Sequence, residues 1–374
     1  MKELTVITSV KAVNGGVGQI FLDRVCSSFT NTKYIRFIPL GGLIPGILGK
    51  AVSKVVLRSR IIGAIEFIFD MVFTTPFLTI YLITMKKSCN LFVTMSSRTI
   101  YRAIALVSFL KKDASLVLIV WDMPSYIINL NTYRFKWINH LDHWFFDKAI
   151  SNANGLVTMG NRMDQALLKR VPYLPSTIHV KGQVVKNLRQ CRARLPGESI
   201  RFIFAGSIYA KDTWNSFVRS MSEVDWEIDG SKIELHLVGA IPLSGVELPD
   251  QVTTYGPLAI QQVYEVLENC HIGYAPYSFK TDFKDTALTS FPGKISDYIA
   301  VGLPFFYHGP EESEVFDSIQ RSGAGVSCDS IINSEIIYAV KKIIQNYKIL
   351  NSQIPNFIKS ELSVDEDGLN KLLR

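Results

Sequence analysis

The chain has 374 residues, of which 48% are hydrophobic, 11% aromatic and 20% charged. This composition is typical of a folded protein of about two domains, and it excludes disorder, collagen-like repeats and a disulfide-rich scaffold. The formal net charge of +7 is uneven, because residues 1–175 carry 21 Lys and Arg against 9 Asp and Glu, whereas the remainder carries 19 against 24. We therefore expect the first half to meet an anionic partner, either nucleic acid or an anionic membrane surface.

The beginning of the chain and its cysteines indicate the compartment. Residues 1–4 lead directly into a strand-like segment, without the basic and apolar regions or the cleavage site of a signal peptide. The five cysteines are scattered singly, with no CxxC pair, which fits a reducing environment. The sequence predicts a cytoplasmic protein.

Short apolar strands recur along the chain and are separated by stretches of helix length. Near-continuous hydrophobic strands of this kind indicate parallel sheets covered on both faces. The first set comprises Leu4–Val10, Tyr34–Ile38, Leu91–Thr94, Leu116–Trp121 and Gly155–Met159. The second comprises Arg201–Ala205, Ile233–Val238, Cys270–Ala275, Pro304–Tyr307 and Ala324–Ser327. We expect an α/β protein with two Rossmann-like doubly wound domains in tandem, and a boundary near residues 175–200.

A glycine-rich turn follows the first predicted strand. Gly15 and Gly16 precede a predicted helix, Val17–Phe29, so that backbone N–H groups at the helix start are open to a ligand. The turn is not GxGxxG, and no acidic residue closes the second strand, which disfavours a dinucleotide site. A plain tight turn is the alternative.

Two segments of the first half suggest contact with a membrane. Lys50, Lys54 and Arg58 share one face of an otherwise apolar predicted helix, which is either a membrane-surface helix or a domain helix with a solvated basic face. Residues 61–85 contain only two charged residues and are long enough to span a bilayer. Because both charges are acidic and Pro76 is central, we expect two buried or interface-dipping helices, broken near residues 74–76, in preference to a span.

The clearest motif lies in the second half, from Thr289 to Pro304. It predicts a short helix that Ser290 can cap and that Gly302 ends. The free N–H groups at its start and Lys294 would suit a diphosphate, and Asp297, one turn on, could accept hydrogen bonds from sugar hydroxyls. From these residues alone, a well-capped structural helix is an equal alternative.

This helix resembles the donor-binding signature of GT-B glycosyltransferases, and further segments resemble theirs in the same order along most of the chain. The chain is similar to glycosyltransferase family 4 and, more distantly, to the xanthan glucuronosyltransferase. The segments that carry the resemblance are the Gly15-Gly16 turn, Val120–Pro124 (VWDMP), Ser151–Met159 (SNANGLVTM), Arg201–Ser207 with Lys211, Leu235–Gly239, Thr254–Pro257 and Cys270–Tyr277 (CHIGYAPY).

The resemblance implies the GT-B fold, with two Rossmann-like domains facing a central cleft. Residues 1–176 would bind the acceptor, with Gly15 and Gly16 on the acceptor side; residues 177–350 would bind a nucleotide-sugar; and residues 351–374 would return as helices to the first domain. The residues implied to bind the donor diphosphate or nucleotide are Gly206, Ser207, Lys211, Tyr277, Ser290, Phe291, Lys294 and Asp297.

The resemblance also implies a mechanism without a metal or other cofactor. No DxD-type motif occupies a suitable place, so lysines and helix-end N–H groups would meet the charge of the departing diphosphate. For an inverting reaction Asp122 would be the catalytic base, and otherwise it would position the acceptor; a carboxylate that caps the turn before Pro124 is the alternative. His308 is either near the diphosphate or a surface residue.

The expected function is transfer of a sugar from a nucleotide-sugar to a saccharide acceptor, which we expect to be lipid-linked, in bacterial surface polysaccharide synthesis. The enzyme would work at the inner face of the cytoplasmic membrane, against an anionic membrane surface and without nucleic acid. Thr289 and Ser207 stand where relatives have Glu and Arg. These departures leave open a non-catalytic membrane-peripheral subunit as an alternative. A nucleotide-sugar epimerase of the same fold, which would also bind the nucleotide, is the other alternative.

Overall fold

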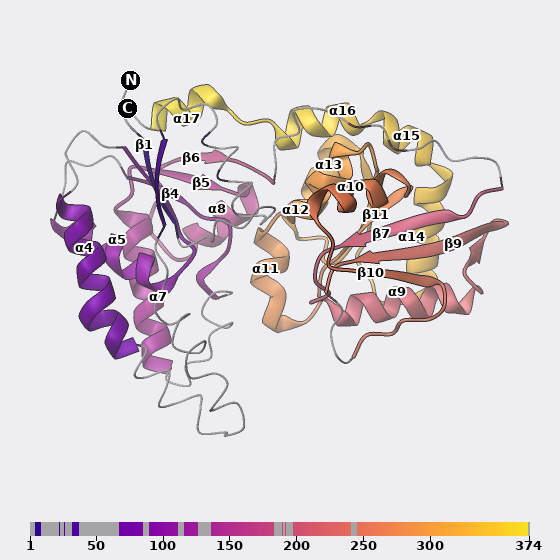
Figure 1. Ribbon diagram of the computed structural model, residues 1–374, viewed down its shortest axis with the longest axis horizontal. Coiled ribbons are helices and arrows are strands. Elements are labelled where there is room, and N and C mark those ends of the chain that lie inside the picture. Colours follow the sequence, from indigo (N-terminus) through magenta and orange to yellow (C-terminus); the bar gives the residue numbers. More distant parts are fainter. Residues whose placement is uncertain are drawn as a thin grey trace. The chain divides into compact units, whose positions relative to one another are not determined.

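The computed structural model divides the chain into two compact units, Met1–His179 with Asp365–Arg374, and Val180–Val364. Both are α/β units (Figure 1). The predicted glycine turn, the helix that follows it and the basic helix of residues 46–60 lie outside the described residues. The structure describes residues 4–8, 22, 26, 32–36, 67–84, 90–110, 116–125, 136–182, 189, 191, 197–240 and 245–372.

Unit 1 is built on a parallel sheet with the strand order β2-β1-β3-β4-β5-β6. Every neighbouring pair is parallel, as the continuous apolar runs predict. The order reverses between β1 and β3, which creates a topological switch at the carboxyl ends of those strands. The strands are β1 (Leu4–Thr8), β2 (Thr32–Arg36), β3 (Asn90–Thr94), β4 (Leu116–Ile119), β5 (Gly155–Thr158) and β6 (Ser176–His179).

Four helical segments belong to unit 1 in the described part of its main segment. Helix α5 packs against both α4 and α7, and α4 lies on the outer side of this helix layer (Figure 1). Besides α4, described next, the helices are α5 (Arg98–Leu110), α7 (Lys136–Ser151) and α8 (Asn161–Leu168).

The apolar segment before β3 is one helical stretch, Phe67–Thr84, and the predicted break near residues 74–76 is wrong. A π turn, Asp70–Thr74, runs directly into α4 (Thr75–Thr84). Pro76 lacks an N–H group, and its ring needs room in the preceding turn, so the wider π turn accommodates it without ending the helix. By length and composition this stretch is apolar enough to cross a bilayer, and a third of it is buried.

Unit 2 has a second parallel sheet, in the order β10-β9-β7-β11-β12-β13, with the short β8 antiparallel to β9. Its order reverses between β7 and β11, so this unit has a switch point of its own. The ten strands predicted from apolar runs in the two units are all present, with ends shifted by a few residues. The strands of unit 2 are β7 (Ile200–Ala205), β8 (Glu227–Ile228), β9 (Ser231–Val238), β10 (Val252–Gly256), β11 (Ile272–Pro276), β12 (Phe305–His308) and β13 (Gly325–Cys328).

An aromatic core fills unit 2 beneath its helices. Phe202 of β7, Tyr274 of β11 and Phe306 of β12 meet Phe217 of α9, with the Phe217 and Tyr274 rings stacked 4.5 Å apart. The helices that follow the strands are α9 (Lys211–Glu223), α10 (Ile260–Glu268), α11 (Lys284–Thr289), α12 (Gly293–Ala300), α13 (Glu314–Ser322) and α14 (Asn333–Gln345).

The end of the chain leads from unit 2 into unit 1. Helix α17 (Glu366–Leu372) packs on β6, and Leu372 lies so close to Gly155 that a Cβ there would come within 2.9 Å of its side chain. The segments before it are α15 (Tyr347–Ser352), α16 (Ile354–Phe357) and a π turn, Ile358–Leu362.

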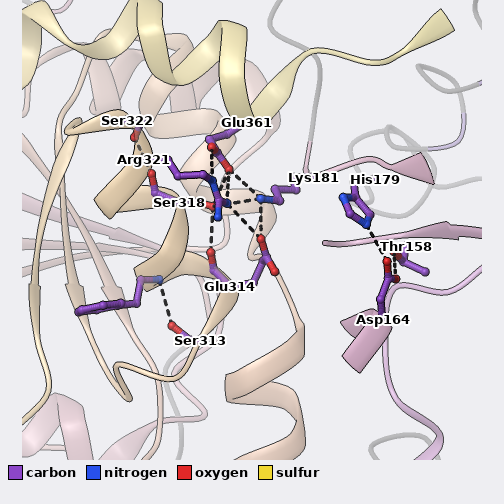
Figure 2. A network of polar contacts seen from close by, with 11 residues as sticks. Thr158, Asp164, His179, Lys181, Ser313, Glu314, Ser318, Arg321, Ser322 and Glu361 are labelled. Atoms are coloured by element: carbon purple, nitrogen blue, oxygen red, sulfur yellow. Dashed lines mark hydrogen bonds and ion pairs between the residues drawn. The ribbon is translucent and has the colours of Figure 1, made fainter. Parts of the chain in front are cut away.

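A buried ion cluster in unit 2 fixes both segments that connect it to unit 1 (Figure 2). Lys181, just after β6, contacts Glu314 at 2.6 Å and Glu361 at 2.7 Å. Arg321 of α13 also binds Glu361, at 2.8 Å. Burial raises the pKa of Glu361, but Arg321 and Lys181 outweigh burial and hold it at about 2. Glu361 therefore stays ionised, and the cluster ties residues 181 and 361 to α13.

Candidate functional site

The switch point of unit 2 presents backbone instead of side chains. Gly206 follows β7 and adopts a φ of +125°, which L side chains rarely adopt. Gly239, at the end of the neighbouring β9, passes so close that a Cβ would lie 2.1 Å from the Gly206 carbonyl oxygen. The two glycines therefore leave an exposed floor at the carboxyl ends of β7 and β9.

Helix α12 begins beside this floor. Its N-cap residue is Pro292, and no side chain caps it, so the N–H groups of its first turn are not bound by the N-cap side chain. The prediction that Ser290 caps this helix is wrong. The Ser290 hydroxyl lies 2.6 Å from the Thr286 carbonyl oxygen and 3.1 Å from the Tyr277 hydroxyl, so Ser290 ends α11 instead.

Lys294, the second residue of α12, lies over the glycine floor. A Cβ on Gly206 would be 3.8 Å from its Nζ, and the Nζ lies 3.9 Å from the centre of the Phe204 ring. No hydrogen bond or ion pair holds this ammonium group among the residues that the structure describes. Burial without a counterion lowers its pKa from 10.5 to about 7. Lys294 is thus a cation that an anionic ligand would stabilise.

Aromatic side chains line the same site. The Tyr209 ring lies 5.8 Å from the Lys294 Nζ and 5.9 Å from the Tyr277 ring. Tyr277 is buried, and its carbonyl oxygen accepts a hydrogen bond from Thr213. Phe291 is buried, and its ring lies 6.4 Å from the Phe357 ring, so its side chain belongs to the core of the unit. Any contact of Phe291 with a ligand would come from its backbone.

The loop after β7 carries the other predicted donor residues. Ser207 is exposed, and Lys211 opens α9. The neighbouring Asp212 accepts hydrogen bonds from the Ser278 hydroxyl at 2.8 Å and the Phe279 N–H at 3.1 Å. This carboxylate holds the loop after β11 against the start of α9, so both loops form one edge of the site. Sequence reasoning did not identify Asp212.

Asp297 lies one turn after Lys294 but bonds elsewhere. One of its carboxylate oxygens accepts a hydrogen bond from the Tyr264 hydroxyl of α10 at 3.0 Å.

His308 is fully buried, bonded to the Ser330 carbonyl oxygen at 2.6 Å and to the Tyr274 hydroxyl at 3.2 Å. Burial lowers its pKa to about 4, so His308 is a neutral core residue and not a surface one.

The switch point of unit 1 carries hydroxyl groups. The Thr8 and Thr94 hydroxyls, at the carboxyl ends of β1 and β3, lie 2.9 Å apart, and the Ser96 hydroxyl lies 3.0 Å from that of Thr94. Sequence reasoning missed these residues. The signal that could have found them is their position at or directly after the ends of the predicted buried strands. Such hydroxyls can bind a polar ligand at the strand ends.

Asp122 stands in the same unit, three residues beyond β4. It is half-buried, and no hydrogen bond or ion pair reaches it from the described parts of the chain. Burial raises its pKa from 3.8 to about 7. A carboxylate with a pKa near neutrality can accept a proton from a hydroxyl, which is the property of a general base. The alternative that Asp122 caps the turn before Pro124 finds no bond to support it within those parts.

No group of three or more His, Cys, Asp and Glu residues is placed to hold a metal ion within the described ranges. Two acidic residues of α7 that could resemble ligands bind arginines instead. Asp142 contacts Arg102 at 2.6 Å, and Asp147 contacts Arg170 at 2.8 Å. We therefore assign them to the packing of unit 1.

Comparisons with known proteins show the fold. No family model matches the sequence, and no curated protein matches it. A structure described as trehalose-6-phosphate from E. coli bound with UDP-2-fluoro glucose has a TM-score of 0.67 at 6% identity and covers 100% of this chain and 99% of that chain. Sucrose-phosphate synthase from Thermosynechococcus elongatus has a TM-score of 0.67 at 11% identity, with 99% and 97% covered.

A third match is the lipopolysaccharide outer core galactosyltransferase in its apo form. Its TM-score is 0.57 at 12% identity, and 100% of this chain and 99% of that chain are covered. At such low identities these matches establish architecture alone. The chain has the GT-B glycosyltransferase fold over its full length.

Proposed function

We propose that the protein is a metal-independent glycosyltransferase that moves a sugar from a nucleotide-sugar to a lipid-linked saccharide acceptor. The observation that carries the proposal is Lys294, a half-buried cation at the start of α12, beside the Gly206 floor and without an ion pair from the described residues. An unneutralised cation at a helix N-terminus is suited to a diphosphate.

The proposed reaction follows from the charges. The bond between the anomeric carbon and the diphosphate oxygen breaks, and the nucleoside diphosphate leaves with the bonding electrons. Lys294, Lys211 and the first N–H groups of α12 would stabilise the charge that develops on it. A hydroxyl of the acceptor forms the new bond to the anomeric carbon, and in an inverting reaction its proton passes to Asp122. Asp297 and the exposed Ser207 would contact the donor.

The pathway and location are part of the same proposal. Motifs of the chain resemble those of glycosyltransferase family 4, and one structural match acts on lipopolysaccharide outer core. A role in bacterial surface polysaccharide synthesis, at the inner face of the cytoplasmic membrane, is consistent with both. The excess of basic residues in residues 1–175 supports an anionic membrane surface as a partner.

The test is thermal stabilisation of the protein by a panel of nucleoside diphosphates. A ligand at about 100 times its Kd adds about 2.7 kcal/mol to the free energy of unfolding. We expect one diphosphate to stabilise the wild type but not Lys294→Met, and to stabilise the control Lys348→Met, which changes an exposed lysine of α15. No response to any diphosphate would contradict the donor site. Once the stabilising nucleotide is known, the corresponding nucleotide-sugar can be assayed with and without an acceptor. Release of the nucleoside diphosphate only when an acceptor is present would indicate transfer and not epimerisation.

A further inference from the structure

The helical stretch Phe67–Thr84 turns a large apolar face to solvent. Six of its large hydrophobic side chains are 37–71% exposed, which is the opposite of what a helix covering a sheet normally does. A contiguous exposed apolar face of this size marks an interaction site. We call this the outer face; its residues are Ile68, Val72, Phe73, Phe77, Ile80 and Tyr81.

The π turn brings these residues onto one side. In an unbroken α-helix, residues four apart share a face. Ile68 and Val72 keep that spacing, and so do Phe73, Phe77 and Tyr81, but Phe77 is five positions beyond Val72. The π turn, Asp70–Thr74, takes up the additional residue, so Phe77 and Ile80 continue the face of Ile68 and Val72. The local geometry thus favours one continuous apolar surface.

The inner side of the same stretch carries polar and charged groups beside apolar ones. Asp70, the one charged residue between positions 67 and 84, accepts hydrogen bonds from Arg102 at 2.9 Å and from the Thr99 hydroxyl at 2.6 Å. Arg102 is 1% exposed and also donates to Asp142 of α7, at 2.7 Å. Thr75 and Thr79 are buried on this side as well, together with Leu78 and Leu82. The polar and charged groups of the stretch thus lie on its inner side, whereas its outer face is apolar, as in helices that face lipid.

Helix α7 extends the apolar surface. Trp137 is 60% and Trp144 is 44% exposed, and the Trp137 ring packs edge-on against Phe67 at 5.4 Å. An open groove of about 740 Å³ is lined by Trp137, His140, Leu141 and Trp144. Tryptophan is enriched at membrane interfaces because its ring is apolar and its N–H needs a polar partner.

The basic residues near this stretch in the sequence favour an anionic occupant. Arg58 and Arg60 precede the stretch, Lys86 and Lys87 follow it, and residues 1–175 carry an excess of basic residues. Lys148 of α7 lies 6.0 Å from the Trp144 ring. An apolar face in the basic half of the chain matches a bilayer whose acyl chains lie beneath anionic headgroups.

We propose that the outer face, with Trp137 and Trp144, lies in the plane of an anionic bilayer and enters its acyl region. The helix does not span, because its inner side is held on α5 and α7 by the Asp70–Arg102–Asp142 contacts. This inference deepens the proposed function and rests on the membrane partner named there. It does not rest on the donor site, because lipid binding needs no nucleotide.

The test measures binding to vesicles of phosphatidylglycerol and phosphatidylcholine with the double variant Phe73→Ser/Phe77→Ser. Both side chains point to solvent, so the fold does not depend on them. We expect at least about a tenfold loss of partitioning into the vesicles. The matched control, Tyr338→Ser/Ile349→Ser, removes apolar side chains that are 69% and 62% exposed on unit 2, and it should bind as the wild type does.

Fluorescence quenching distinguishes insertion from adsorption. Acyl-chain brominated lipids should quench the wild type more than the Trp137→Phe/Trp144→Phe variant, and the wild type should remain bound at roughly 1 M salt, where surface electrostatics are screened. The proposal is overturned if the wild type does not bind vesicles, if the serine variant binds equally well, or if salt alone releases the protein. A dimer in solution that the serine variant dissociates would also overturn it, because a second copy would then cover the face.

Nucleoside diphosphate binding, followed in parallel by thermal shift, distinguishes failure of the membrane-surface proposal from failure of the donor-site proposal. The serine variant should keep the full nucleotide response of the wild type, since the outer face and Lys294 belong to different units. Loss of vesicle binding with nucleotide binding intact supports the membrane surface alone. Nucleotide binding that fails while vesicle binding persists contradicts only the donor site.

Discussion

Unit 2 contains two lysines that differ in the groups that surround them. Lys181 contacts two carboxylates, of Glu314 and Glu361, within 2.7 Å (Figure 2). Lys294 is half-buried, and its neighbours are the Phe204 and Tyr209 rings and the Gly206 backbone. The lysine with partners stabilises the fold, whereas the lysine without them among the described residues is available to a ligand. Burial alone does not distinguish structural from functional charges; the presence of a counterion does.

Asp122 in unit 1 follows the same rule with the opposite charge. Burial brings the pKa of Asp122 up to about 7, as it brings that of Lys294 down to about 7. Burial destabilises the charged form of each side chain, and a bound substrate would stabilise that charged form. Four predictions test this contrast between charges that are held in ion pairs and charges that a ligand would stabilise.

The largest effect is expected for Lys181→Met, which removes the central cation of the buried cluster. Of the two cations that contact both Glu314 and Glu361 among the described residues, Arg321 then remains, so the free energy of unfolding should fall by about 3–5 kcal/mol. Urea denaturation followed by fluorescence of the buried Trp214 and Trp226 measures this loss. Adding Glu314→Gln to the variant should restore part of the stability. An unchanged midpoint would show that the cluster is not a structural element.

Lys294→Met should act in the reverse way, with lower function and higher stability. We expect about a 10²-fold loss of activity, as for removal of one donor to a developing negative charge. The folded-state pKa of about 7 lies below the unfolded value of 10.5, so the lysine destabilises the protein most below pH 7 and not at all above pH 10.5. The variant should therefore melt higher than the wild type at pH 6. A lower melting temperature would contradict the assignment.

Asp122→Asn should lower kcat by about 10²-fold in an inverting reaction, because the acceptor hydroxyl loses its base. The folded-state pKa is raised, so the carboxylate costs stability above pH 7, and this cost disappears as the pH falls through 7 toward 3.8. The variant should melt higher than the wild type at pH 8 and equally at pH 4. Wild-type activity in the variant would leave Asp122 without a catalytic role.

The smallest expected effect is a displacement of the pH profile. In the free enzyme Asp122 must be deprotonated and Lys294 protonated, and both have a pKa of about 7, so kcat/KM should form a narrow bell around neutrality. Once the diphosphate is bound, it favours the charged lysine. The alkaline limb of kcat should then lie at least about one pH unit above that of kcat/KM. Coincident alkaline limbs would place Lys294 away from the diphosphate.

The sheets were predictable from the sequence because each central strand is a continuous apolar run. The edge strand β10 gave no such signal, since three of its five residues are exposed. The π turn could not be predicted either, because the sequence shows Pro76 as a helix breaker and does not show how the preceding turn accommodates it. The inward placement of Asp70 follows from that turn and from Arg102, a contact between residues 32 positions apart.

The residues of the candidate donor site were predicted from a motif resemblance, but their chemistry depends on tertiary structure. Nothing in the sequence near Lys294 shows that Phe204 and Gly206 surround it and lower its pKa. The Lys181 cluster was missed for the same reason, because its members lie up to 180 positions apart. Local patterns identify which groups can ionise, whereas packing decides which of them find partners.

Proton uptake on nucleotide binding tests the central claim, that Lys294 is the cation of a diphosphate site. At pH 8 a lysine with a pKa of about 7 is mostly neutral, and a bound diphosphate should protonate it. Calorimetric titration with the stabilising diphosphate, in two buffers of different ionisation enthalpy, should show uptake of about one proton by the wild type. The Lys294→Met variant should show none. Binding to the wild type without proton uptake would contradict the account.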